Sequence, residues 1–589
     1  MISTLLRTGA RILAILVSFL LLPAACGRTA SGAESPAAGL KTIADEYFTG
    51  FVEAYPVYAT ILGVPQAPND RLGDNSLAAT RAWQQKEDRW LERLKAIPVA
   101  QVPPQEQATH GVLLETLEAS IQSRVCRAEL WPLNQQSGLQ ILLPFLAQLQ
   151  PVGSERLRGE AVARWRAMPG YIDTEVASLR QGLLQGYTLP RANVESIVEQ
   201  LDDLLKLPAA QSPFAALAER DPAPGFGDAV RDIVSSQVAP ALARYRDFLR
   251  TEYLPKARTT TAIAALPDGA ACYSARVRAY ATVDMTPEVV HQLGLDQMAA
   301  LESQMRAFGP RAAGSDDLQT ILERQRSDPK LRFKTREEII HVAEEAAARG
   351  RDAMPRFLGR MPKARYIVDP CQPFEEKSGC PGSYVPGTPD GSRPGRFRIN
   401  AGDPTAQRRP LAEGTAFHEG IPGHHLQVSL AQEREGAHPI TRYFVFSGFT
   451  EGWALYSERL ADEMGLYSTD LDRLGDLGEQ ALRAARLVVD SGLHVLGWSR
   501  QQAIDYMTAH LVYPPAYIVS EVDRYIADPG QATAYMIGRL EIERLRQQAA
   551  AKLGQRFDLR EFHDRVLENG SVPLGFLRTR IERWLAQKQ

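Results

Sequence analysis

The sequence predicts a mainly α-helical protein with a small β element, and three observations lead to this prediction. Through residues 42–348, apolar side chains recur at the three- and four-residue spacing of amphipathic helices, as at Trp83, Trp90 and Leu94. Strand-like alternation is scarce, and its clearest instance is the short run at residues 396–400. The 589 residues are 44% hydrophobic and 23% charged, a balance typical of a large globular protein.

The charge balance excludes several classes of protein. The chain carries 67 basic and 70 acidic side chains, which gives a formal net charge of -3. This balance supplies no electrostatic reason to bind a polyanion, so we expect no nucleic-acid partner. The same composition argues against a disordered chain and against a polytopic membrane protein.

The first 25 residues have the pattern of a signal peptide. Arg7 and Arg11 precede an apolar run of 11 residues, Ile12 to Leu22. That length suits a signal peptide and is shorter than the ~20 residues of a membrane span. We therefore expect an exported protein.

Cys26 is a candidate lipidation site. Small residues lead up to it as in the bacterial lipobox, where the cysteine is lipidated after cleavage and becomes the new N-terminus. Pro23 departs from that pattern because an aliphatic residue is usual there, and cleavage by the ordinary signal peptidase is the alternative. The expected product is a periplasmic bacterial lipoprotein that contacts the membrane only through this anchor, with residues 26–38 as lipidated cysteine and tether.

The four other cysteines permit two disulfides in an oxidising compartment. They are Cys126, Cys272, Cys371 and Cys380. We favour the pairing of Cys371 with Cys380, because Gly379, Pro381 and Gly382 make that stretch a loop.

The body of the chain divides at about residue 360. Residues 39–360 form the mainly helical N-terminal region, which we expect to supply much of the wall of a cleft. Residues 361–589 begin with a stretch rich in Cys, Gly, Pro and Asp and then return to helical spacing. This second region contains the densest group of chemically capable side chains, and the two parts are expected to intertwine.

The segment from Thr415 to Gln427 contains three of the ten histidines of the chain, His418, His424 and His425. It resembles a stretched form of the zincin helix H-E-x-x-H, in which two histidines one turn apart bind one zinc ion. The position where the second histidine should stand is occupied by Pro422. Another histidine therefore has to replace it.

Helical geometry alone does not bring a second histidine to the metal. On a straight helix, His424 points about 120° away from His418 and lies ~9 Å along the axis, while His425 is almost in line but ~10.5 Å away. Pro422 and Gly423 open the helix, because proline removes a backbone donor and glycine frees the backbone to turn. We predict His418 and His424 as zinc ligands, with His425 as the alternative second ligand. The histidine of this pair that does not bind zinc would support a ligand or face the substrate.

The remaining parts of a one-zinc site lie nearby. Glu419 follows the first histidine and is the predicted general base. Glu451 opens an amphipathic segment 27 residues after His424, a distance that allows it to return as the third ligand. Glu458, two turns further on, is placed to hold a ligand histidine by its other ring nitrogen, with a solvated acid as the alternative.

At these residues the chain resembles the bacterial domain-of-unknown-function 885 family. The resemblance covers the mature chain and is carried by residues 384–574, in the segments 390–400, 418–427, 451–458, 486–494 and 529–538. It implies a gluzincin-like zinc metallopeptidase with a two-lobed helical body and a deep cleft. It also implies His418, His424 and Glu451 as ligands of one Zn²⁺ per chain, with Glu419 as base.

The predicted chemistry is metal-assisted hydrolysis of a peptide bond, so the expected partner is a peptide substrate. His494 and Tyr535 are the candidate donors to the oxyanion, and the alternative is that His494 is a buried helix histidine and Tyr535 packs in the core. Arg393 and Asn400 are candidates for substrate binding, and the alternative for Arg393 is a turn that it holds together with Asp390.

Two other functions fit the same residues. One is a non-catalytic lipoprotein that binds peptides or envelope partners, and the other is an amidohydrolase of a non-peptide amide. A base beside a metal site favours hydrolysis over binding, whereas the identity of the substrate and the oligomeric state lie outside what the sequence determines.

Overall fold

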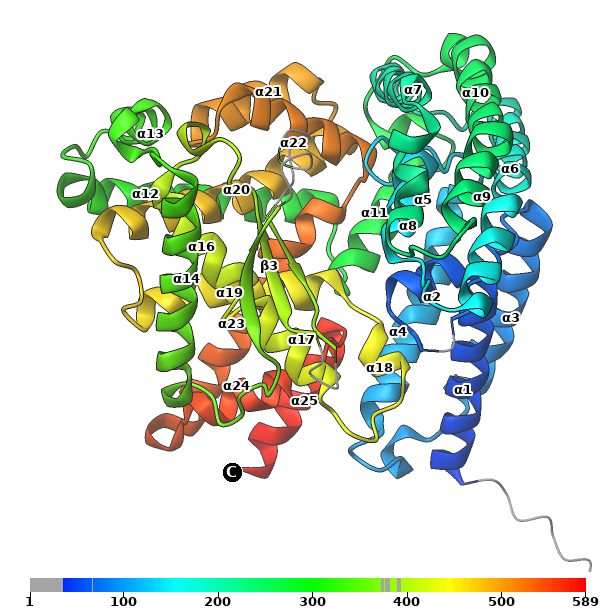
Figure 1. Ribbon diagram of the computed structural model, residues 1–589. Helices are drawn as coiled ribbons and strands as arrows, with labels where there is room; N and C mark the ends of the chain where they lie inside the picture. Colours follow the sequence, from blue (N-terminus) through cyan, green and yellow to red (C-terminus); the bar gives the residue numbers. More distant parts are fainter. Residues whose placement is uncertain (1–34, 66, 372–375, 377–381, 389–392, 589) are drawn as a thin grey trace, which may run out of the picture.

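The computed structural model describes residues 35–65, 67–371, 376, 382–388 and 393–588. The predicted signal peptide and Cys26 lie outside these residues. Among the described helices, none is both long enough and apolar enough to cross a membrane. The helices and the small sheet agree with the predicted fold class, since helices make up most of the chain (Figure 1).

Fourteen α-helices precede the sheet in the described part of the chain. They are α1 (Pro36–Ala54), α2 (Pro56–Ile61), α3 (Leu77–Lys95), α4 (Gln107–Ser123), α5 (Leu139–Leu149), α6 (Glu155–Leu184), α7 (Arg191–Lys206), α8 (Ala216–Glu219), α9 (Phe226–Ile233), α10 (Ala239–Phe248), α11 (Gly269–Ala281), α12 (Pro287–Ala312), α13 (Leu318–Ser327) and α14 (Arg336–Ala353). In α3 the predicted apolar face is buried at Trp83, Trp90 and Leu94.

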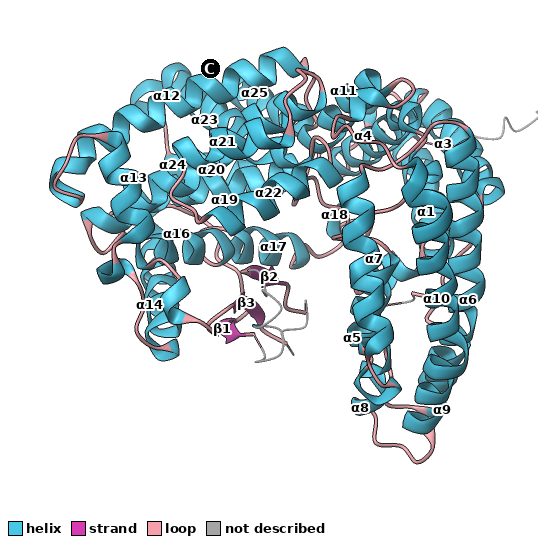
Figure 2. Ribbon diagram, turned by 90° about the horizontal axis from the view of Figure 1, so that it is seen from above, coloured by secondary structure: helices cyan, strands magenta, loops and turns pink. Residues whose placement is uncertain are grey.

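The sheet has three described strands, β1 (Tyr366–Pro370), β2 (Ser383–Val385) and β3 (Gly395–Ile399). Strand β3 lies in the middle, parallel to β1 and antiparallel to β2. It confirms the predicted strand, shifted by one residue, and it buries Gly395, Phe397 and Ile399 on one face. Figure 2 shows the sheet beside α16 and α17, at the site described below.

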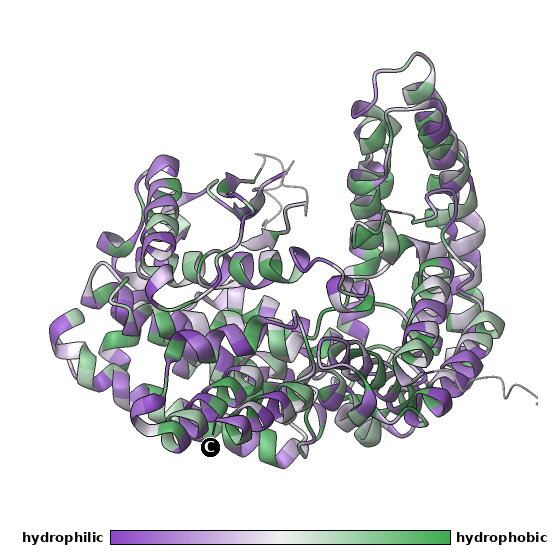
Figure 3. Ribbon diagram, turned by 90° about the horizontal axis from the view of Figure 1, so that it is seen from below, coloured by the Kyte–Doolittle hydropathy of each residue, from purple (hydrophilic) through white to green (hydrophobic). Residues whose placement is uncertain are grey.

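The helices after the sheet carry most of the chemistry. They are α16 (Arg409–Glu419), α17 (His424–Gln432), α18 (Ile440–Tyr443), α19 (Ser447–Glu463), α20 (Asp470–His494), α21 (Arg500–His510), α22 (Pro515–Ala527), α23 (Ala534–Leu553), α24 (Leu559–Leu567) and α25 (Leu574–Gln587). Most of them carry both apolar and polar stretches, as expected for helices with one buried face (Figure 3).

Two hydrophobic cores hold the molecule together, and each takes residues from both halves of the sequence. The larger core joins α5–α7 and α10–α12 to α20–α22. The second joins α1, α3 and α4 to α14, α16, α19 and α23–α25. Neither half therefore buries its apolar surface without the other.

The helix that carries Glu451 and Glu458 is held in place by glycines. On α19, Gly448 and Gly452 meet Gly538 of α23, and a Cβ added to Gly538 would lie 1.7 Å from the carbonyl oxygen of Gly448. Any larger side chain there would push the helices apart. The close crossing fixes α19 against the core and so fixes where its two carboxylates lie.

A disulfide joins Cys126 to Cys272, with a Cα–Cα distance of 4.7 Å. It connects the end of α4 to α11 across 146 residues. Cys371 is also disulfide-bonded, and its predicted partner, Cys380, lies outside the described residues.

Candidate metal centre

The zincin-like segment folds as two helices with a turn between them. Helix α16 ends at Glu419, residues 420–423 form the turn, and α17 begins at His424. A Cβ added to Gly423 would lie 1.9 Å from the carbonyl oxygen of His418, so only glycine fits at this point. The predicted break in the helix at Pro422 and Gly423 is confirmed. We expected one helix with a widened turn, whereas the structure has two separate helices.

This turn is attached to α19. The indole Nε1 of Trp453 donates a hydrogen bond to the carbonyl oxygen of Pro422 over 2.9 Å. The backbone N–H of His425 donates to the carbonyl of Gly420 over 3.1 Å. These bonds fix the direction in which α17 leaves the turn, and with it the ring of His424.

Three side chains converge as a group that could hold a metal ion: His418, His424 and Glu451. Oε2 of Glu451 lies 3.4 Å from Nε2 of His418 and 3.5 Å from Nε2 of His424. Ligand atoms about 2.0–2.2 Å from a tetrahedral zinc ion lie about 3.3–3.6 Å apart. The donor set and its spacing therefore fit zinc.

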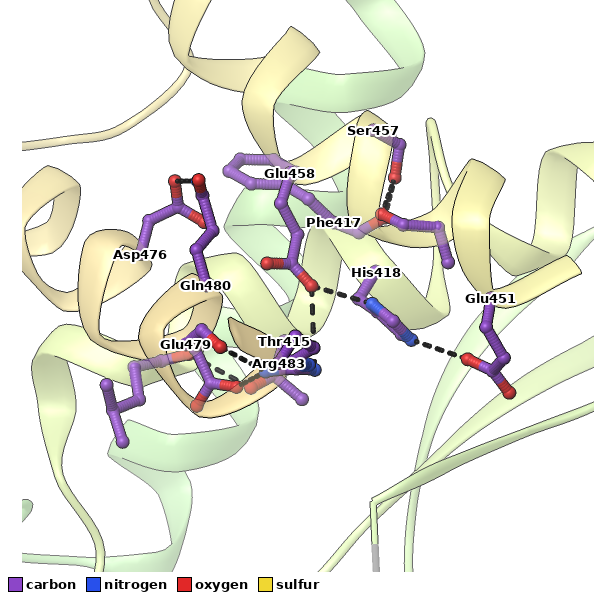
Figure 4. Close-up of polar contacts among 12 residues, drawn as sticks. Thr415, Phe417, His418, Glu451, Ser457, Glu458, Asp476, Glu479, Gln480 and Arg483 are labelled. Carbon is purple, nitrogen blue, oxygen red and sulfur yellow. Dashed lines mark hydrogen bonds and ion pairs between the residues drawn. The ribbon is translucent and has the colours of Figure 1, made fainter. Parts of the chain in front are cut away.

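Glu458 holds the other side of the first histidine. Its Oε1 lies 2.6 Å from Nδ1 of His418 (Figure 4). Glu451 and Glu458 are seven residues apart on α19, so they project from the same side of the helix about 10.5 Å apart. The two carboxylates thus face opposite nitrogens of one imidazole, which confirms the contact predicted for Glu458.

The charges around the site favour a cation. Burial disfavours the charged form of His418, but the hydrogen bonds to Glu451 and Glu458 outweigh it and raise the pKa of His418 to about 10. Burial acts to raise the pKa of Glu451, yet the charges of His424 and His418 hold that pKa well below its usual range. A divalent cation would replace the proton on Nε2 of His418 and contact Glu451, while Glu458 would still accept a hydrogen bond from Nδ1.

Glu419 lies beside the ligand group with a free oxygen. Its side chain is largely buried, and its Oε2 has no hydrogen-bond partner among the described residues. Glu419, His418, His424 and Glu451 all line one cavity of about 1570 Å³. The free carboxylate oxygen is therefore available to a molecule in that cavity.

The wall of this cavity comes mainly from the second half of the chain. Helix α16, strands β2 and β3, and helices α20 and α22 supply about half of the lining, and loops such as residues 400–408 supply much of the rest. Of the described residues before 361, only Gln136 and Ile339 take part. Residues 39–360 contribute little to this lining, and α12 and α14 pack against α20 and α16 instead.

His425 points away from the ligand group. Its Nδ1 lies 3.0 Å from the hydroxyl of Tyr384 and 3.3 Å from that of Ser429, and its ring packs against Tyr366. Burial lowers the pKa of His425 to about 4, so the ring is neutral. The structure therefore places His424, and not His425, with the other ligands.

His494 lies in the core, which contradicts its proposed role as an oxyanion donor. Its Nδ1 accepts the backbone N–H of Ile263, and its Nε2 donates to the carbonyl of Tyr525. The side chain is fully buried and does not line the cavity. Both ring nitrogens serve the backbone, so neither is left for a substrate.

Tyr535 does line the cavity. The guanidinium carbon of Arg486 lies 4.5 Å from the centre of its ring. Burial, followed by the charge of Glu451, raises the pKa of Tyr535, which keeps the phenol protonated. Tyr535 therefore presents a protonated phenol in the same cavity as the ligand group.

The two candidate substrate residues lie in loops. Asn400 lines the cavity, but its amide accepts from the N–H of Gly402 and donates to the carbonyl of Glu376. Arg393 is exposed and donates to the carbonyl of Pro386, and it is not part of the cavity lining. Arg393 therefore matches the alternative of a turn, and Asp390 lies outside the described residues.

The comparison with known proteins gives a family. A family model described as "Bacterial protein of unknown function (DUF885)" matches residues 56–581. The chain belongs to the DUF885 family. No curated protein matches its sequence.

Two solved structures resemble this DUF885 protein over nearly their whole length. A candidate lipoprotein from Colwellia psychrerythraea is 26% identical, covers 94% of this chain and 100% of its own, and has a TM-score of 0.85. A candidate lipoprotein of unknown function from Shewanella oneidensis is 18% identical, with coverages of 93% and 99% and a TM-score of 0.72. Both likenesses show the shared fold.

Tyr366 lies next to the turn at Gly420 in this DUF885 protein, and no sequence pattern predicted it. Its hydroxyl is buried without a hydrogen-bond partner among the described residues, and a Cβ added to Gly420 would lie 2.5 Å from it. Burial, followed by the charge of Glu419, raises its pKa. Tyr366 lies in β1, about fifty residues before Glu419, so no local spacing indicated it.

We expect Glu458→Gln to weaken zinc binding to this DUF885 protein by about 10- to 100-fold. The amide still accepts a hydrogen bond from His418, but it lacks the negative charge that makes the ring a better ligand. Competition with a chromophoric chelator measures the affinity. Glu463→Gln is the matched control, because Glu463 is on the same helix but pairs with Arg546 at the surface. Equal affinities in the two variants would contradict the role of Glu458.

Proposed function

We propose that this protein is an exported zinc-dependent hydrolase that cleaves peptide bonds. One observation carries the proposal: two imidazole Nε2 atoms and a carboxylate oxygen converge at zinc spacing, and a second carboxylate with an unpartnered oxygen lies beside them in a large cavity. A site that only binds a metal has no need of that second carboxylate.

The residues of the site have separate tasks. When bound, zinc would lower the pKa of a water molecule and polarise a carbonyl group. His418, His424 and Glu451 would hold the ion, and Glu458 would fix the orientation of His418. Glu419 would accept the proton of the attacking water at its free Oε2 and pass it to the leaving amine.

A donor is needed where negative charge develops on the substrate. Tyr535 would supply it from α23, because it lines the cavity and its neighbour Glu451 disfavours loss of the phenol proton. Arg486 packs on the ring face and would hold the phenol in place.

Export and lipid anchoring belong to the same proposal. The N-terminal sequence has a signal-like run followed by Cys26, and the two similar structures are described as candidate lipoproteins. We place the protein in the periplasm, attached to a membrane through Cys26.

The proposal is tested with purified full-length protein and peptide pools. We expect one zinc ion per chain by elemental analysis and cleavage of peptides that stops when a chelator removes the metal and resumes when zinc is returned. Zinc binding without cleavage of any pool would favour a binding lipoprotein. Cleavage confined to non-peptide amides would favour an amidohydrolase.

A further inference from the structure

A buried arginine without a partner faces the cavity at the far end of α16. Arg408 immediately precedes that helix and is 9% exposed. It lines the same cavity as Glu419. Its guanidinium has no hydrogen bond or ion pair with any described residue, and its Nε is fully buried without a partner.

Two further arginines act on Arg408. Burial lowers the pKa of Arg408 to about 10, and Arg332 and Arg326 lower it further, while Tyr513 and Glu479 act in the opposite direction. Arg332 donates to the carbonyl of Ala406, and Arg326 donates to those of Thr508 and Leu511 and also pairs with Glu323. Arg408 itself forms no ion pair with any described residue.

Glu479, whose charge acts on Arg408, already has two partners. Glu479 accepts from Arg483 and from the hydroxyl of Tyr513. Tyr513 in turn lies under the Arg408 guanidinium, 5.9 Å from its carbon to the ring centre. A buried unpaired guanidinium is costly, and chains that keep one in a binding cavity commonly use it for an anionic ligand.

Helix α16 connects this arginine to the metal centre. Leu411, Ala412, Thr415 and Glu419 follow Arg408 along the cavity at the spacing of one helix face. Arg408 and His418 are ten residues apart, which corresponds to about 15 Å along the axis. An extended peptide advances about 3.3 Å per residue, so about four residues span that distance.

We propose that Arg408 binds the terminal carboxylate of the substrate peptide, about four residues beyond the bond that is cleaved. This proposal rests on the proposed function. A guanidinium with free N–H groups binds a carboxylate through two parallel hydrogen bonds, which gives both affinity and orientation. The α16 face then sets the length of the fragment that is released.

The first test compares peptides that differ only at the C-terminus. For zinc-loaded wild type, we expect kcat/KM to be about 10- to 100-fold higher for a free-acid peptide than for its amide. In Arg408→Met this ratio falls to about one. The ratio should be largest when about four residues follow the cleaved bond.

Arg332→Met is the matched control. It removes one positive charge from the same neighbourhood, but Arg332 does not line the cavity. We expect the acid-to-amide ratio to stay at its wild-type value in this variant. A loss of the ratio in both variants would mean that general charge, and not contact with Arg408, recognises the carboxylate.

A binding measurement separates the failure of this proposal from the failure of the proposed function. Calorimetry with the zinc-loaded Glu419→Gln protein compares the acid and the amide peptide without turnover. Tighter binding of the acid, lost in the double variant with Arg408→Met, supports Arg408 even if no peptide is cleaved. Equal binding of the acid and the amide overturns the proposal. An amidated peptide with a glutamate at its last position has a side-chain carboxylate in place of the terminal one, and if it binds as tightly as the free acid, recognition of the terminal carboxylate is also overturned.

Thermal unfolding distinguishes binding from a structural role. Because Arg408 is buried without an ionic partner, Arg408→Met should keep or raise the unfolding temperature. A lower unfolding temperature together with an unchanged acid-to-amide ratio would make Arg408 a structural residue.

Discussion

Glu419→Gln should abolish most of the hydrolytic activity and leave the metal in place. General-base catalysis contributes about 10²- to 10⁴-fold, so we expect kcat to fall by that factor, about 3–5 kcal/mol in the barrier. Glutamine has the same shape as glutamate but does not accept a proton from water at neutral pH. Glu419 is not in the ligand group, so zinc should remain at one ion per chain.

The measurement combines steady-state kinetics on a cleaved peptide with elemental analysis of the same sample. Glu435→Gln is the control, because Glu435 is an exposed carboxylate beyond the end of α17. It should retain full activity, and the loss of activity in Glu419→Gln purified in the same way would exclude a contaminating protease. Full activity in Glu419→Gln would show that Glu419 is not the general base. Loss of zinc from this variant would mean that Glu419 contributes to metal binding.

The stability of the Glu419→Gln protein gives an independent check. The carboxylate is largely buried with one oxygen unpartnered, an arrangement that a neutral amide relieves. The variant should therefore unfold at the same temperature as wild type or at a higher one. Residues that serve chemistry often cost stability in this way.

Local spacing was sufficient to find the ligand group. His418 and His424 lie on either side of a turn whose proline and glycine are visible in the sequence, and Glu451 lies near the start of α19, which returns to them. Glu458 followed from the same helix, two turns on. The histidines and Glu458 needed only the geometry of a single helix or turn, whereas Glu451 also needed a connection that brings its helix back to them.

The errors concerned residues whose role depends on distant segments. His494 has a polar ring on a helix, but its two nitrogens are taken by the backbone near residues 263 and 525. Arg408 and Tyr366 carried no motif, and their lack of partners became visible only once α16, α20 and β1 were packed together. Sequence shows which groups can ionise, whereas packing decides which of them remain unpaired.

The adjacent histidines provide the sharpest test of the metal site. His424→Ala removes one of three protein ligands, and we expect zinc affinity to fall by on the order of a thousandfold, beyond the 10- to 100-fold effect typical of an outer partner. Dialysis followed by elemental analysis should then find the chain without zinc and inactive. His418→Ala should behave in the same way.

His425→Ala should instead keep its zinc and lose stability. The ring contacts Tyr384, Ser429 and Tyr366 on the side of the sheet, so its removal leaves a cavity and unpaired hydroxyls at a cost of about 1–3 kcal/mol. Denaturant unfolding measures that cost in the same samples. If His425→Ala lost zinc while His424→Ala retained it, the second ligand would be His425. The turn at Pro422 and Gly423 sets the different directions of the His424 and His425 rings. That result would therefore also mean that the backbone of this turn differs from the one described.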